Sequence, residues 1–197
     1  MRQLIAVSSR ALLMFSLLTG VAYPALITGI ALVAFPHQAG GSLVERNGKA
    51  VGSAWLGQPF HSARYFWGRP SATTPEYNTA SSTASQLGPT SATLDSAVRA
   101  RVAVLRAAGT TGPIPVDLVT GSGSGLDPDI SPAAGFAQVG RVARARGLDS
   151  TAVQRLAESQ VQGRAWGVFG EPRLNVLALN LALDRDRKST RLNSSHG

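Results

Sequence analysis

The longest apolar stretch of the chain runs from Ala11 to Phe35, 25 residues without an Asp, Glu, Lys, Arg or His. A helix of that length is roughly 37 Å long at ~1.5 Å per residue, whereas the hydrocarbon core of a bilayer is about 30 Å thick. The pattern therefore predicts a single transmembrane helix near the N-terminus, in contact with membrane lipid.

The charges on either side of this stretch predict its orientation. Arg2 and Arg10 precede it, whereas residues 36–44 contain no Lys or Arg. Cytoplasmic flanks of transmembrane helices carry the excess of basic residues. We therefore expect residues 1–10 in the cytoplasm and an extracytoplasmic domain over residues 36–184.

A cleaved signal peptide is the alternative interpretation of the same stretch. Signal peptides have an apolar region of about 7–15 residues, followed by a cleavage site with small residues. The apolar run here is longer, and His37-Gln38-Ala39 places a histidine where a small residue is required. The pattern favours an uncleaved anchor.

Some residues inside the apolar stretch are small or distort helices. Ser16 and Gly20 are four residues apart, a spacing that lets another helix backbone approach closely. Pro24 removes an internal hydrogen bond, which Thr side chains or neighbouring helices can replace in a bundle. Ser16, Gly20, Pro24 and Gly29 are therefore candidates for packing against partner helices. The alternative is that small residues are simply common in transmembrane helices.

The pattern beyond the apolar stretch predicts a mixed α+β domain. Residues 37–90 are rich in Gly, Pro, Ser, Thr and Asn, which predicts loops and short strands. Apolar residues at three- and four-residue spacing predict an amphipathic helix over residues 91–108, ended by Gly109. A short strand is predicted over residues 115–120.

Two more helices and a closing strand are predicted towards the C-terminus. Ser131-Pro132 is a typical helix start, and Gly147 is a typical helix stop. Asp149 is expected to cap the helix that follows. Alternating leucines over residues 174–183 predict a strand that completes the domain.

Composition narrows the function classes. The chain has no cysteine, which excludes disulfides, thiolate metal sites and cysteine nucleophiles. Its formal net charge is +8, but a polar tail over residues 185–197 supplies +3 of this, from Arg185, Asp186, Arg187, Lys188 and Arg191. The sequence has no basic run interleaved with aromatic residues, so nucleic acid is not an expected partner.

The segment Gly121–Gly125 is the best candidate for chemistry outside the apolar stretch. It lacks the lysine of a phosphate-binding loop, the glycine spacing of a dinucleotide-binding turn and the serine position of a hydrolase elbow. His37, His61 and His196 offer no evident base for a serine nucleophile. No catalytic residue is assigned, and a membrane-anchored extracytoplasmic hydrolase or binding module is kept as the alternative class.

Two carboxylates follow this segment directly. Carboxylates and loop carbonyls are hard oxygen ligands that suit alkali cations. Ser124, Asp127 and Asp129 are therefore candidates for attracting a cation at a point of entry, without forming a metal site. The alternative is that both aspartates form turn and capping hydrogen bonds ahead of the helix that starts at Ser131.

Taken together, the motifs resemble those of one family, the C subunit of the bacterial Kdp-type potassium-transporting ATPase. The resemblance extends from Leu12 to Asp184 and includes the exit of the apolar stretch. It rests on Thr19-Gly20, Tyr23-Pro24, Thr28-Gly29, Phe35-Pro36-His37-Gln38-Ala39, Arg69-Pro70-Ser71, Tyr77-Asn78, Leu87-Gly88-Pro89-Thr90, Pro115-Val116-Asp117-Leu118-Val119-Thr120, Gly123-Ser124-Gly125-Leu126-Asp127-Pro128, Ile130-Ser131-Pro132-Ala133-Ala134, Gly170-Glu171-Pro172-Arg173 and Asn175-Val176.

The resemblance implies a non-catalytic accessory subunit of a high-affinity, ATP-driven potassium uptake complex in the bacterial plasma (inner) membrane. The implied partners are a channel-like potassium-binding subunit, a P-type ATPase subunit that uses the ATP, and a very small helical subunit. Potassium is then the transported ion, and no cofactor is expected on this chain. The sequence agrees in lacking an Asp-Lys-Thr-Gly-Thr phosphorylation motif.

Two roles are implied for such a subunit. The first is to cover the potassium entrance with the extracytoplasmic domain. The second is to raise the pump's apparent affinity for ATP. The expected topology favours the first role, because a domain outside the membrane cannot touch a cytoplasmic nucleotide.

The end of the chain departs from the resemblance. Residues 187–196 do not resemble the family's C-terminus and look like translated sequencing-adaptor sequence. We therefore assign no functional residue to this segment and discount its charge.

Overall fold

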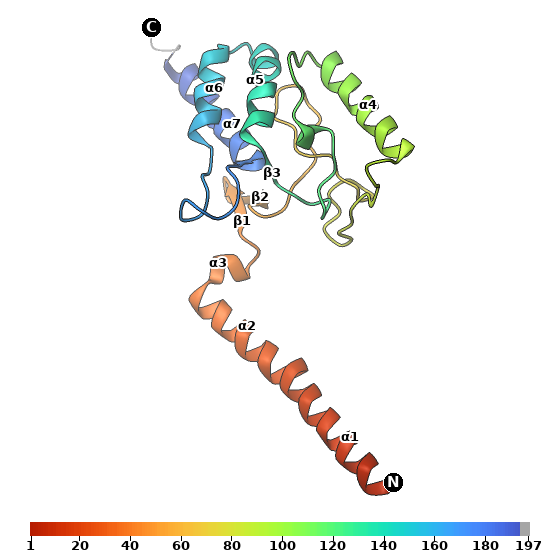
Figure 1. The fold of residues 1–197 in the computed structure, drawn as a ribbon. Coiled ribbons are helices and arrows are strands. Elements are labelled where there is room, and N and C mark those ends of the chain that lie inside the picture. The colour runs from red at the N-terminus through yellow and green to blue at the C-terminus, as the bar shows by residue number, and fades with distance from the viewer. Residues whose placement is uncertain (194–197) are drawn as a thin grey trace. The chain divides into compact units, whose positions relative to one another are not determined.

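The computed structural model describes residues 1–193, and their side chains through residue 185. The chain divides into two compact units, Met1–Ser53 and Ala54–Gly197. Figure 1 draws the chain coloured from its N-terminus to its C-terminus and labels most of its helices and strands. The expectation of a mixed helix-and-strand protein with one long apolar N-terminal helix is confirmed.

The first unit begins with a continuous helix from Arg2 to Ala34, made of α1 (Arg2–Leu17), the π-helical turn η1 (Leu18–Ala22) and α2 (Tyr23–Ala34). The helix is 33 residues long and is long and apolar enough to cross a membrane. It starts earlier than the predicted stretch, because Arg2 and Arg10 are compatible with helix although they are not apolar.

The π-helical turn ends at Ala22, two residues before Pro24. Proline has no N–H group, and its ring clashes with the carbonyl four residues earlier in a regular α-helix. Here the N–H of Tyr23 donates to Leu18 O, five residues back, and the Thr19 hydroxyl donates to Phe15 O at 2.7 Å. The wider turn thus accommodates the proline without ending the helix.

A short helix and a hairpin complete the first unit. The helix α3 (Pro36–Ala39) is followed by strands β1 (Leu43–Arg46) and β2 (Lys49–Ser53), which pair antiparallel. The turn between the strands is Asn47-Gly48, with φ of +53° and +72°, as expected for an Asn-Gly hairpin turn. These elements agree with the short strands predicted for residues 37–90.

The second unit opens with a long irregular segment. Residues 54–91, all of them described, contain no helix and no extended strand, and α4 (Ala92–Ala107) follows. Ser91 caps α4 by accepting the Leu94 N–H at 3.4 Å, and Gly109 follows with φ of +90°. The helix predicted over residues 91–108 is therefore confirmed.

The strand predicted over residues 115–120 is wrong. Residues Val116–Leu118 form a short 3₁₀ turn, η2. The turn is held by the Thr120 hydroxyl, which donates to Val116 O at 2.8 Å, and it directs Asp117 towards Ser131. Leu118 and Val119 are both buried although they are consecutive, so the burial does not alternate as in a half-buried strand.

The two helices predicted from their capping residues are confirmed. Helix α5 (Pro132–Arg146) begins after Ser131, whose hydroxyl accepts the Ala134 N–H at 3.0 Å, and ends at Gly147 with φ of +67°. Helix α6 (Ser150–Ser159) is capped by the Asp149 carboxylate, which accepts the Ala152 N–H at 3.1 Å.

The closing strand predicted over residues 174–183 is also wrong. Only β4 (Leu174–Asn175) is extended, where it pairs antiparallel with β3 (Asp129–Ile130), and α7 (Val176–Asn193) follows at once. The side chain of Asn175 starts this helix by accepting the Ala178 N–H at 3.0 Å. The residues that decide the outcome are buried at helical spacing, namely Val176, Leu179, Asn180 and Leu183. The predicted polar tail begins within α7, and residues 194–197 lie outside the described part.

The core of the second unit lies among α5, α6 and α7, which are seen side by side in Figure 1. Its largest fully buried apolar side chains are Phe66, Val142, Val153, Leu174, Leu179 and Leu183. Phe66 is the member that comes from the irregular segment, so this segment is part of the core.

Buried polar side chains fix the irregular segment to the helices. Asn180 of α7 accepts the Phe66 N–H at 2.8 Å and donates to Phe66 O at 3.0 Å. Gln138 of α5 bonds in the same reciprocal way to Trp67, at 2.8 and 3.1 Å. Both amides are 2 % exposed or less.

Two arginines on α5 extend this arrangement. Arg141 is buried, its guanidinium lies 3.9 Å from the centre of the Trp67 ring, and it donates to Ala63 O and Tyr65 O. Burial lowers the pKa of Arg141 to about 10, so it stays charged at neutral pH. Arg146 forms an ion pair with Asp184 at 3.0 Å. The chain leading to Arg69 is therefore rigidly placed.

Candidate functional site

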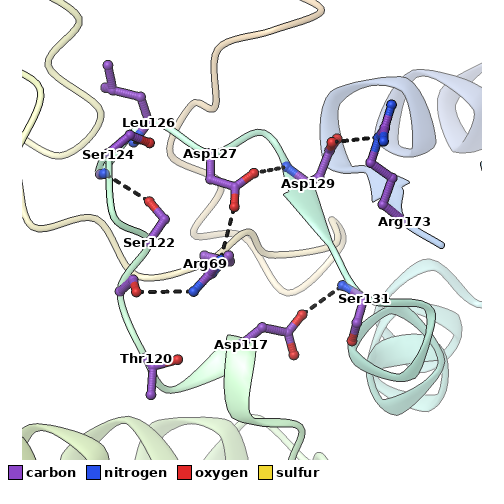
Figure 2. Close-up of polar contacts among 12 residues, drawn as sticks. Arg69, Asp117, Thr120, Ser122, Ser124, Leu126, Asp127, Asp129, Ser131 and Arg173 are labelled. Atoms are coloured by element: carbon purple, nitrogen blue, oxygen red, sulfur yellow. Dashed lines mark hydrogen bonds and ion pairs between the residues drawn. The ribbon is translucent and has the colours of Figure 1, made fainter. Parts of the chain in front are cut away.

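The segment Gly121–Asp129 connects η2 to β3 and is bound to the irregular segment by Arg69. The two outer nitrogens of Arg69 donate to the Asp127 carboxylate at 3.0 Å and to Gly121 O at 3.1 Å. Figure 2 shows Arg69 between the two ends of the loop. One side chain thus closes the glycine-rich segment into a defined loop.

The serines of this loop form local backbone hydrogen bonds. The Ser122 hydroxyl accepts the Gly125 N–H at 2.9 Å, and the Ser124 hydroxyl accepts the Leu126 N–H at 3.1 Å. Gly125 has φ of +68°, and a Cβ on it would lie 2.7 Å from Thr83 O, so glycine is required here. The two hydroxyls act as turn formers.

Asp127 has two partners. One carboxylate oxygen pairs with Arg69, and the other accepts the Asp129 N–H at 3.0 Å. This second contact is the turn hydrogen bond that the sequence offered as the alternative to cation attraction. The side chain of Asp127 is 29 % exposed, and that of its partner Arg69 is 26 % exposed.

Asp129 is paired with a residue from the far end of the unit. One of its oxygens lies 3.0 Å from Arg173 Nε as an ion pair, and the other accepts from Asn175 Nδ2 at 3.1 Å. Burial raises the pKa of Asp129 above its ordinary value, partly opposed by Asn175 and Arg173. Each candidate carboxylate is therefore accompanied by one arginine, and the local charge is nearly balanced.

A third carboxylate completes the cluster. Asp117, in η2, accepts the Ser131 N–H at 2.7 Å, next to the capping bond that Ser131 forms with α5. Figure 2 shows Asp117 on the opposite side of Arg69 from Asp127. The described residues contain no group of three His, Cys, Asp or Glu side chains arranged to hold a metal ion.

Tyr77 packs beneath the loop. Its hydroxyl donates to Arg69 O at 2.6 Å, and its ring lies so close to Gly57 that a Cβ there would clash with it and would lie 2.7 Å from Asp127 O. Burial, with smaller contributions from Glu76 and Asp127, raises the pKa of Tyr77 to about 12. Its hydroxyl is therefore a permanent donor in the neutral range.

A cleft of about 480 Å³ lies beside this cluster. Its walls include Phe60, Trp67, Tyr77, Val104 and Leu118. The cleft is also lined by the charged residues Arg69, Glu76 and Arg101, so its lining is mixed. The cation-attracting candidates named from the sequence do not line this cleft but belong to the loop.

The structure places Ser124, Asp127 and Asp129 in one loop, in which Asp127 bonds to the Asp129 N–H and Ser124 bonds to the Leu126 N–H. It adds Arg69, Tyr77, Asp117, Arg173 and Asn175, which were not assigned to the site from the sequence. All five belong to the motifs that carry the family resemblance. Membership of these motifs was the one sequence signal that could have pointed to them. In the folded chain, motifs that are far apart in the sequence meet at one cluster.

The helix-packing candidates lie in the first unit. Ser16, Gly20, Pro24 and Gly29 are exposed along the helix, and a Cβ on either glycine would have no atom within 4 Å in the described chain. The helix therefore has a notch at each of the two glycines. No other part of the described chain fills either notch.

The described chain thus combines one helix long and apolar enough to cross a membrane with a small unit of helices and short strands. A family profile described as KdpC, the c chain of K⁺-transporting ATPase, matches residues 5–185. This chain belongs to the KdpC family. The matched range ends where the predicted polar tail begins.

Curated relatives agree over most of the chain. The potassium-transporting ATPase KdpC subunit of Sorangium cellulosum (strain So ce56) is 59% identical over 179 residues, covering 89% of this chain and 94% of the relative. That of Methylibium petroleiphilum is 56% identical over 190 residues, covering 95% of this chain and all of the relative. That of Methylococcus capsulatus is 55% identical over 176 residues, 88% of this chain and 93% of the relative.

Tyr77→Phe tests the contact beneath the loop. The change leaves Arg69 O without its donor and should lower the free energy of unfolding by about 1–3 kcal/mol. Because the folded-state pKa of Tyr77 is raised to about 12, the stability that its hydroxyl contributes is complete below pH ~10 and is lost between pH ~10 and pH ~12. Thermal unfolding of the full chain in detergent should show the two proteins converging over that range. A constant difference would contradict the assignment.

Proposed function

We propose that this chain is a non-catalytic accessory subunit of an ATP-driven potassium uptake complex. The observation that carries the proposal is membership of the KdpC family over nearly the whole chain. The relatives are named as subunits of a potassium-transporting ATPase. ATP is then bound and hydrolysed by another chain, and potassium is the cargo of the complex.

The proposed partners are the channel-like potassium-binding subunit, the P-type ATPase subunit and the small helical subunit. The N-terminal helix anchors the chain in the bacterial plasma membrane as a single pass, with residues 1–10 in the cytoplasm. Residues 36–184 form the extracytoplasmic domain and cover the potassium entrance. Support comes from the length of the apolar helix and from Arg2 and Arg10 at its start.

Topology can be tested with introduced cysteines, because the natural chain has none. Thr151→Cys lies in an exposed position at the start of α6, and Gln3→Cys lies at the start of α1. In intact spheroplasts a membrane-impermeant maleimide should label the first variant, and should label the second only after permeabilisation. The reverse pattern would overturn the proposed orientation.

Helix packing is the second part of the proposal. A leucine at position 20 would fill the notch that Gly20 leaves for a partner helix. Gly20→Leu should weaken association by about 1–3 kcal/mol, and the yield of co-purified channel-like subunit should fall roughly fivefold or more. Ala22→Leu adds similar bulk to a different face and is the matched control. Equal yields from both variants would argue against a packed face at Gly20.

Cation attraction by Ser124, Asp127 and Asp129 is the third part of the proposal. Fields act over ~8–10 Å at physiological salt, so these residues act only on ions that pass close to the loop. Their arginine partners reduce the local field, since Arg69 and Arg173 each lie 3.0 Å from a carboxylate. Removal of one arginine should therefore strengthen the attraction.

Charge changes of opposite sign distinguish cation attraction from loop formation. Asp127→Asn with Asp129→Asn should raise the potassium concentration for half-maximal ATPase activity roughly two- to fivefold, whereas Arg69→Gln should lower it. The measurement uses complexes that assemble with normal yield. If the residues only hold the loop, the two variants will impair the complex in the same direction, and the cation-attracting role will be excluded.

A further inference from the structure

Residues 162–173 form an arm that projects between α6 and β4. Its base is closed by two backbone hydrogen bonds, from Gln162 N–H to Arg173 O at 2.8 Å and from Arg173 N–H to Gln162 O at 3.0 Å. Nearer the tip, Ala165 and Phe169 exchange two more, at 2.8 and 3.0 Å. The two halves of the arm are thus paired antiparallel by backbone hydrogen bonds.

The tip of the arm exposes three large apolar side chains. Trp166 is 91% exposed, Val168 69% and Phe169 62%. The Trp166 and Phe169 rings meet edge-on with their centres 6.0 Å apart. Trp166 also has φ of +51°, an uncommon conformation for a bulky residue, and its exposed side chain contributes little to the core. The tip therefore has a cost in folding and no evident benefit within the unit.

The shape of the arm argues against a specific protein interface. Residues 162–172 are all exposed, so the apolar tip has no surrounding rim of the same unit. Protein interfaces generally need about 1,000 Å² or more, with near-neutral residues that exclude water around the central aromatic anchors. Tryptophan is enriched at membrane–water interfaces, and tryptophan together with phenylalanine is typical of apolar faces that lie at the boundary of headgroups and acyl chains.

The covalent chain limits how far the first residue of the second unit can lie from the end of the apolar helix. From Ala34 the chain passes through α3 to Leu43, which pairs with Ser53 across the β1–β2 hairpin. Adding the reach of these segments places Ala54 within roughly 35 Å of Ala34. The second unit is therefore tethered within reach of the bilayer surface if the helix spans the membrane.

The arm emerges close to the point where the chain enters the second unit. Asn175 Nδ2 donates to Ala54 O at 2.9 Å and to Asp129 at 3.1 Å, and Asp129 also pairs with Arg173 at the base of the arm. Trp55, next to Ala54, is itself 64% exposed. The base of the arm therefore lies at the end of the unit where the chain enters it.

We propose that the tip formed by Trp166, Val168 and Phe169 inserts into the headgroup region of the bilayer that carries the N-terminal helix. The inference rests on the membrane-spanning part of the proposed function and not on its potassium-entrance part. The tip enters about 5–10 Å deep, as interfacial apolar residues do. The lipid surface and the transmembrane helix then hold the second unit at two points.

The charges of the arm are already paired. Arg164 lies 2.8 Å from Glu171, and Arg173 lies 3.0 Å from Asp129. Insertion therefore depends on apolar burial and not on attraction to anionic lipid. It should occur in zwitterionic phosphatidylcholine bilayers and should persist in about 1 M salt, where screening is nearly complete within ~3 Å.

Depth-dependent quenching tests the inference on the full chain in phosphatidylcholine nanodiscs. A fluorophore is attached to Val168→Cys at the tip, to Gln154→Cys on the exposed face of α6 as the control, and to Leu32→Cys in α2. Lipids with a nitroxide near the headgroup should quench the Val168→Cys label at least twofold more than the Gln154→Cys label, in low and in high salt. Adding Trp166→Ser and Phe169→Ser should abolish the difference without changing the circular dichroism spectrum.

The remaining outcomes separate the inference from the proposed function. Equal quenching at positions 168 and 154, with Leu32→Cys quenched by deep nitroxides, would overturn the docked arm and leave the span intact. An unquenched Leu32→Cys label would overturn the span and the arm together. A last alternative is that a protein partner covers the tip in the assembled complex. In that case the label at position 168 would be shielded from water in the complex but not quenched by lipid, and the docked arm would be overturned.

Discussion

The second unit depends on two buried amide side chains, which form with an irregular segment the backbone hydrogen bonds that a neighbouring strand would otherwise form. Phe66 and Trp67 lie in a segment with no helix or extended strand, yet Phe66 is completely buried. A buried backbone N–H or C=O without a partner is costly. Asn180 and Gln138 each supply a donor and an acceptor in the geometry of a ladder pair. The irregular segment can therefore enter the core without forming a sheet.

Hydrogen bonds from side chains to the backbone also shape the candidate site. Arg69 follows the pinned residues by only a short distance in the chain, and it joins Asp127 to Gly121. Tyr77 then bonds back to the Arg69 carbonyl. The loop is thus shaped by side chains from the irregular segment and not by a sheet. A glycine-rich loop, which alone would be flexible, becomes a fixed feature of the surface.

The sequence predicted those parts of the fold whose signal is local. Ser131, Asp149 and Gly147 act on their own helix ends, and the helices they bound were found as predicted. The errors arose where tertiary contacts decide the outcome. The alternating leucines of residues 174–183 suggested a strand, but burial of Val176, Leu179 and Leu183 against α5 and α6 requires a helix. Arg69 and Arg173 could not be assigned to Asp127 and Asp129, because only folding brings such distant positions together.

The π-helical turn at Leu18–Ala22 determines which residues of the long helix lie on the same face. In a regular α-helix, two steps of four residues rotate the direction of a side chain by roughly 80°, so Ser16 and Pro24 would point to different quarters of the helix. A π-helical turn takes up one residue more, and this roughly cancels the drift between them. Ser16, Gly20 and Pro24 then lie along a furrow nearly parallel to the helix axis, whereas Gly29, five residues further along the regular helix α2, is turned away from it by roughly 140°. A second helix lying lengthwise in this furrow would be in contact over about two turns, where a spiralling pattern would permit contact at one crossing point only.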